Sequence, residues 1–142
     1  MALRTAGSVL LVFLWSVAVD LGQDDWSVTY THQSICTLKG STVNISCSYT
    51  YPSDHKIKNT FWFIKWESDM DPEDLSSVSR YEGQIEYFGD KKSEGSLRIT
   101  DLRLSDSAGY RFRLITSGGK FAGSPVSLTV TGNLSHISHL LL

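Results

Sequence analysis

The chain has 142 residues, of which 41% are hydrophobic and 20% are charged, and its formal net charge is −2. This length allows one domain with a single hydrophobic core, and the ordinary charged fraction argues against disorder. The small net charge and the pI near 6.0 give no reason to expect nucleic acid or an acidic membrane as the partner.

The first predicted element is a cleavable signal peptide over residues 1–22. Arg4 precedes an apolar run from Val9 to Val19, which Asp20 ends. The alternative, an N-terminal membrane anchor, is less favoured because the run is too short to span a bilayer. We expect cleavage between Ala18 and Gln23, and a mature protein that is secreted or held on the extracellular face of the plasma membrane.

Two sequons agree with export. They are Asn44-Ile45-Ser46 and Asn133-Leu134-Ser135, and each is a predicted glycosylation site. The chain has two cysteines, Cys36 and Cys47. Two are too few for a disulfide-stapled miniprotein, so a hydrophobic core must stabilise the fold.

The next elements are short strands, and residues 23–132 are predicted to form one all-β domain. Val43, Ile45 and Cys47 alternate with polar residues, which is the period of a half-buried strand and turns Asn44 outward. Gly118-Gly119 indicates a hairpin turn. The number and spacing of the strands predict a two-sheet sandwich. Further strands are predicted at 61–66, 85–88, 96–99, 109–116 and 125–130.

Residues 133–142 form a predicted short tail that cannot span a bilayer. Either the natural protein ends here and is secreted, or the chain is a truncated product of a longer receptor. His136 and His139 lie in this tail with no third ligand nearby, so we expect no metal site. We also expect no cofactor and no enzymatic activity. The acidic residues between Asp69 and Asp74 are interpreted as an exposed loop.

The segment Asp106 to Tyr110 resembles the motif that opens strand F of immunoglobulin domains. Trp62 and Cys47 match the core tryptophan of strand C and the cysteine of strand B. The resemblance implies a V-type immunoglobulin sandwich with these residues and Asp106 in structural roles. The second cysteine of such domains would fall two residues after the tyrosine, where this chain has Phe112.

The residues from Tyr110 to Arg113 read Tyr-Arg-Phe-Arg, which looks like the strand F signature of the siglecs, the sialic-acid-binding immunoglobulin-type lectins. Trp26 lies where siglecs place a strand A tryptophan. The resemblance covers about residues 26–131 and is closest to the group of the B-cell sialic-acid receptor. It implies that Arg113 contacts the carboxylate of sialic acid and that Phe121, near the start of strand G, is a second aromatic contact.

The chain departs from the siglec pattern at three positions. Siglecs move the disulfide partner of strand B onto strand E, where this chain has Gly95, so Cys47 is expected to be a buried free thiol. Cys36 lies eleven residues before Cys47, which is not the separation that siglecs use for a link to a second domain, so its pairing stays open. Gln84 stands where V-type domains often have an arginine that pairs with Asp106.

Strand parity predicts a binding face on the outside of the C-F-G sheet. Arg111 and Arg113 point outward on strand F, as Phe61, Phe63 and Lys65 do on strand C. A guanidinium can hold a carboxylate through two parallel hydrogen bonds, and aromatic rings can cover the apolar parts of a sugar.

Two functions stay open for this face. The first is recognition of sialylated glycans or cell-surface glycoproteins in cell adhesion or immunity. The second is a protein-binding module, in which the charged groups are solvated and the phenylalanines pack under another immunoglobulin domain.

Overall fold

The computed structural model describes residues 25–66, 70–90 and 92–133. The predicted signal peptide, His136 and His139 lie outside these residues. The described part consists of strands joined by turns and loops, with three short 3₁₀ segments at Leu75–Ser77, Ser79–Tyr81 and Leu104–Asp106. The strands are β1 (Ser27–Tyr30), β2 (Ser34–Leu38), β3 (Val43–Thr50), β4 (Ile57–Phe63), β5 (Ile85–Phe88), β6 (Glu94–Ile99), β7 (Ala108–Thr116), β8 (Lys120–Ala122) and β9 (Val126–Thr131).

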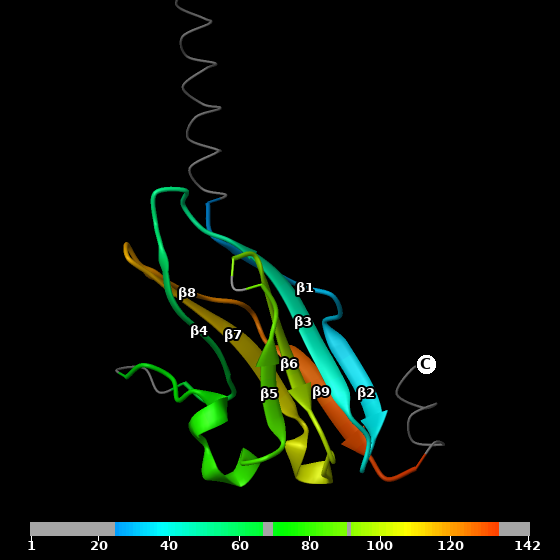
Figure 1. The fold of residues 1–142 in the computed structure, drawn as a ribbon. Helices are drawn as coiled ribbons and strands as arrows, with labels where there is room; N and C mark the ends of the chain where they lie inside the picture. The colour runs from blue at the N-terminus through cyan, green and yellow to red at the C-terminus, as the bar shows by residue number, and fades with distance from the viewer. Residues whose placement is uncertain (1–24, 67–69, 91, 134–142) are drawn as a thin grey trace, which may run out of the picture.

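The strands form two sheets that pack face to face (Figure 1). One sheet has the order β1-β3-β6-β5. The other has the order β2-β9-β7-β4, with β8 paired to the far part of β7. All pairs are antiparallel except β2 with β9, which run parallel. The predicted all-β two-sheet sandwich is therefore confirmed.

Alternating burial along the strands creates the core between the sheets. In β3 the residues Val43, Ile45, Cys47 and Tyr49 are buried, while the intervening ones, including Asn44, point outward. On β7, Tyr110, Phe112 and Leu114 are buried on the inner side and belong to the same core cluster as Trp62. Burial of these aromatic side chains supplies much of the hydrophobic stabilisation.

Strand β4 differs from its prediction at both ends. The sequence predicts a strand over residues 61–66, but β4 runs from Ile57 to Phe63, and Ile57 pairs with Thr116. The sequence pattern does not indicate the first half of β4, because β4 lies at the edge of its sheet, where polar residues are tolerated. The chain leaves the sheet after Phe63, so Lys65 does not extend the strand. The predicted hairpin turn is present but lies one residue earlier than Gly118-Gly119: the amide of Thr116 donates to the carbonyl of Gly119, so Ser117 and Gly118 are the central residues.

Phe112 fills the place of the missing disulfide. Cys47 pairs across the sheet with Gly95, and neither cysteine is bridged within the described residues. The ring of Phe112 stacks on Tyr49 at 5.1 Å and meets Trp62 edge-on at 5.3 Å. It also occupies the space over Gly95, where an added Cβ would lie 2.5 Å from a ring carbon. Burial raises the pKa of the Cys47 thiol to about 12.

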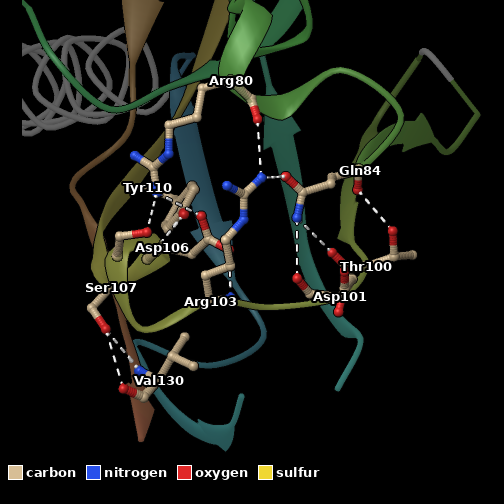
Figure 2. A network of polar contacts seen from close by, with 10 residues as sticks. Arg80, Gln84, Thr100, Asp101, Arg103, Asp106, Ser107, Tyr110 and Val130 are labelled. Atoms are coloured by element: carbon tan, nitrogen blue, oxygen red, sulfur yellow. Dashed lines mark hydrogen bonds and ion pairs between the residues drawn. The ribbon is translucent and has the colours of Figure 1, made fainter. Parts of the chain in front are cut away.

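The start of β7 is fixed by a polar network around the fully buried Asp106 (Figure 2). The Tyr110 hydroxyl donates to the Asp106 carbonyl at 2.6 Å, which is the corner that the immunoglobulin motif implies. Arg80 pairs with the Asp106 carboxylate at 2.8 Å and so supplies the arginine that position 84 lacks. Gln84 instead donates to the carbonyls of Thr100 and Asp101.

Candidate functional site

The outer face of the second sheet brings the two strand F arginines beside the aromatic residues of β4. Phe61 pairs with Arg113 and Phe63 pairs with Arg111 in the antiparallel β4–β7 ladder. Directly opposed residues of a ladder share a face, so these four side chains form one patch. We call this patch, together with Trp66, the arginine face.

The phenylalanines of the arginine face are outward but covered. Phe63 is fully buried, and Phe61 is nearly so. The ring of Trp66, which lies just beyond the end of β4, contacts Phe63 edge-on at 5.5 Å. The indole nitrogen of Trp66 donates to the carbonyl of Met70 at 2.9 Å, which fixes the ring over the face. The sequence does not predict Trp66 at this site, because the strand predicted over 61–66 includes it, whereas β4 ends at Phe63 and Trp66 folds back over the face.

Arg113 lies in the middle of this face and is only 5% exposed. Its guanidinium carbon is 4.6 Å from the centre of the Trp66 ring, a cation–π contact. One terminal nitrogen approaches the carboxylate of Asp71 at 3.5 Å, which is at the limit of a hydrogen bond. The Nε atom is buried and has no hydrogen-bond partner among the described residues. Much of the hydrogen-bonding capacity of Arg113 is therefore unused.

Arg111 is held differently. Its Nε donates to the carbonyl of Gly123 at 2.8 Å, a contact that ties β7 to the segment after β8. Its guanidinium carbon lies 5.3 Å from the ring centres of both Phe63 and Trp66. The side chain is partly buried and acts as a structural clamp on the rim of the face.

Lys120 is a further cation of this face that is not among the predicted site residues. It pairs with Ile115 in the β7–β8 ladder, and Arg113 pairs with Ala122, so Lys120 and Arg113 share the outer side. The Lys120 ammonium contacts both carboxylate oxygens of Asp71, at 3.1 and 3.2 Å. The predicted turn at Gly118-Gly119 would place residue 120 opposite residue 117, which shares the outward parity of residues 113 and 115, so the predicted hairpin already puts Lys120 on the outer side.

Trp26 and Phe121 meet each other but not Arg113. Their rings stack with centroids 6.0 Å apart, and Trp26 also meets His55 edge-on at 5.4 Å. Phe121 pairs with Leu114, which points to the inner side of the sheet. The two aromatic residues therefore lie on the other side of β8 from the arginine face.

Lys65 also lies away from Arg113. It lines a groove of about 410 Å³ together with Glu73, Leu75 and Arg80. The groove runs beside the 3₁₀ segments and the start of β7, and Arg113 does not line it. The structure thus brings Arg111 and Arg113 together, as predicted from parity, and separates Lys65, Trp26 and Phe121 from them.

This fold and the arrangement of its strands agree with the family comparison. The model of the immunoglobulin V-set domain matches residues 30–131, which is more than half of the chain. The chain belongs to the immunoglobulin V-set family. V-set domains are typically recognition modules rather than enzymes, and they mediate protein–protein recognition.

The remaining predicted sites of this V-set domain lie apart from the arginine face. Asn44 is exposed on the outer side of the β1-β3-β6-β5 sheet, where its side-chain oxygen accepts from Arg98 at 3.1 Å. The backbone oxygen of Asn133 accepts from Thr131, and the rest of that sequon lies outside the described residues.

In the part of the chain that the structure describes, no group of three or more metal-binding side chains is assembled. The same residues contain no helix long and apolar enough to cross a membrane.

Proposed function

We propose that this V-set domain is an extracellular recognition module of siglec type, which binds sialylated glycans on cell surfaces through the arginine face. Binding depends on Arg113. The strand position of this arginine matches the siglec signature, and the strand that carries it is paired on both sides, with β4 and with β8. A planar fork of donors is the group that a carboxylate requires for two parallel hydrogen bonds.

The observation that carries this proposal is the unused Nε of Arg113. A buried donor without a partner costs about 1–3 kcal/mol, and the Arg113 Nε is buried and lacks one among the described residues. A ligand carboxylate that reached it would remove this cost as well as forming a charge-assisted bond. Arg111 has its Nε bonded to Gly123 and is expected to matter less. Trp26 and Phe121 lie on the other side of β8 and Lys65 lines a different groove, so all three are expected to be outlying contacts.

The test compares binding to untreated cells with binding to sialidase-treated cells. Wild type and Arg111→Ala should bind only the untreated cells. Arg113→Lys and Arg113→Ala should lose more than tenfold in affinity, since one charge-assisted pair contributes about 1.5–3 kcal/mol. Unchanged melting temperatures are the control for folding. Loss of binding in Arg111→Ala with retention in Arg113→Lys would contradict the assignment.

A second candidate, docking of a protein partner, is favoured by two exposed apolar side chains at the border of the same face. Trp66 is 41% exposed and Met70 is also exposed. Exposed aromatic and methionine side chains beside arginine are typical of protein interfaces. Equal binding of wild type to untreated and sialidase-treated cells would favour this function, and Met70→Ser should then weaken binding while Arg113→Lys has little effect.

A further inference from the structure

The carboxylate of Asp71 lies between Lys120 and Arg113 on the arginine face. It makes two contacts with Lys120, at 3.1 and 3.2 Å, and a single longer one with Arg113, at 3.5 Å. The Asp71 side chain is 62% exposed, whereas that of Arg113 is almost wholly buried. The acid is therefore attached mainly to the exposed lysine and only reaches toward the buried arginine.

We propose that Asp71 holds the position of the ligand carboxylate on Arg113 and is displaced from it when ligand binds. This inference rests on the proposed function of the site. The ligand it implies is a sugar with a planar carboxylate beside its ring. In the exchange, the Asp71 carboxylate stays with Lys120 while the ligand carboxylate takes over the guanidinium.

The geometry of the Arg113 guanidinium favours a ligand carboxylate over that of Asp71. The Nη2 and Nε atoms of an arginine form one side of the fork, and a carboxylate can bond to both at once. Asp71 reaches only Nη2 of Arg113, and Nε is left without a partner among the described residues. A free carboxylate that engages both atoms forms one more charge-assisted hydrogen bond than Asp71 does.

The two partners of Asp71 also make its departure easy. In the exchange Asp71 keeps its ion pair with the exposed Lys120 and gives up only its single 3.5 Å contact with Arg113, whose charge the ligand carboxylate then balances. The Arg113 side chain cannot follow, because Trp66 packs on its guanidinium at 4.6 Å and its strand pairs on both sides. Asp71 is then a competitor built into the site, which lowers the apparent affinity for ligand and adds selectivity for ligands that can bond to both nitrogens.

The experiment removes the competing charge without changing the size of the side chain. Asp71→Asn is titrated with 3′-sialyllactose, 6′-sialyllactose and lactose, with binding followed by NMR. The matched control is Glu73→Gln, which removes the same charge two residues away, at the groove of Lys65 and Arg80. Asp71→Asn should bind at least one sialyllactose about three- to tenfold more tightly than wild type, because the single long hydrogen bond that Asp71 makes to Arg113 is a weak competitor. Glu73→Gln should match wild type.

A second readout follows the Arg113 Nε–H resonance, assigned through its loss in Arg113→Lys. It should move on addition of sialyllactose, but not on addition of lactose, as the Nε gains an acceptor. If wild type binds sialyllactose through Arg113 and Asp71→Asn binds no more tightly, the exchange is wrong while the proposed function stands. If neither protein binds sialyllactose, the proposed function fails and the exchange fails with it. A gain for lactose as large as that for sialyllactose would also overturn the exchange.

Discussion

Gly95→Ala should destabilise this domain far more than a surface glycine-to-alanine change does. The added Cβ would lie 2.5 Å and 2.8 Å from two carbons of the Phe112 ring. Real Cβ atoms do not approach other carbons so closely, so the ring or a strand must move. The ring cannot move freely, because it is 2% exposed and packs between Tyr49 and Trp62.

The size of the effect follows from two opposing terms. Overpacking a tight core by one methyl group costs about 1–3 kcal/mol, and this site lies at the upper end because the ring is confined on both sides. Replacing glycine by alanine also reduces the entropy of the unfolded chain, which offsets about 0.5 kcal/mol. The net loss is about 2 kcal/mol, which corresponds to roughly 8 °C in Tm for a domain of this size.

The assay is a double-mutant cycle measured by thermal and urea unfolding. Phe112→Leu removes the far ring carbons, so Gly95→Ala in that background should be neutral or slightly stabilising. The coupling free energy should be about 2 kcal/mol. Gly132→Ala is the control, since a Cβ there meets nothing within 4 Å. Additive effects of Gly95→Ala and Phe112→Leu would refute the idea that the ring occupies the space of the missing side chain.

Three further predictions concern other parts of the domain. Cys47 should resist thiol labelling in the native protein and react after denaturation. Its pKa rises from 9.0 to about 12 on folding, so the unfolded state loses the proton first and the contribution of Cys47 to stability falls as pH rises above about 9. Cys47→Ala should therefore show a shallower loss of stability in that range. Asn44→Gln should remove one glycan by mass and leave ligand binding unchanged, because Asn44 lies on the opposite sheet. Arg80→Ala should cost about 2 kcal/mol in unfolding, because it leaves the buried Asp106 without its ion pair.

The fold was predictable because its signals are local and redundant. The alternation around Ile45, the Asp106-to-Tyr110 motif and the Gly118-Gly119 turn each specify a strand or a corner without knowledge of its partners. Parity along β7 also placed Arg113 on the outer face correctly. The start of β4 was not predictable from the same signals, because the three residues after Ile57 are polar and the edge position of the strand allows them to be so.

The surroundings of Arg113 were not predictable because they depend on segments that leave the sheet. Trp66 folds back over the face after β4 ends, and Asp71 approaches from further along the same connection. Parity can say that a side chain points outward, but it cannot say whether another segment then covers it. For this reason Arg113, which the sequence predicts to be an exposed cation, is nearly buried. Lys120 could have been found by continuing the hairpin register past the turn.

The core and the arginine face are coupled through two neighbouring residues of β7. Phe112 points inward, where it fills the place of a disulfide, and Arg113 points outward to the proposed ligand. Any change that displaces the Phe112 ring could therefore move the peptide that carries Arg113. Two contacts oppose such a shift, since Arg113 is in register with Phe61 on β4 and with Ala122 on β8. These pairings are made by the backbone of β7, so they still hold Arg113 when a core substitution costs stability without unfolding the domain. A substitution in the core is therefore expected to lower the melting temperature without lowering the affinity for ligand. A variant that loses binding at an unchanged Tm reports on Arg113 and its partners rather than on the packing of Phe112.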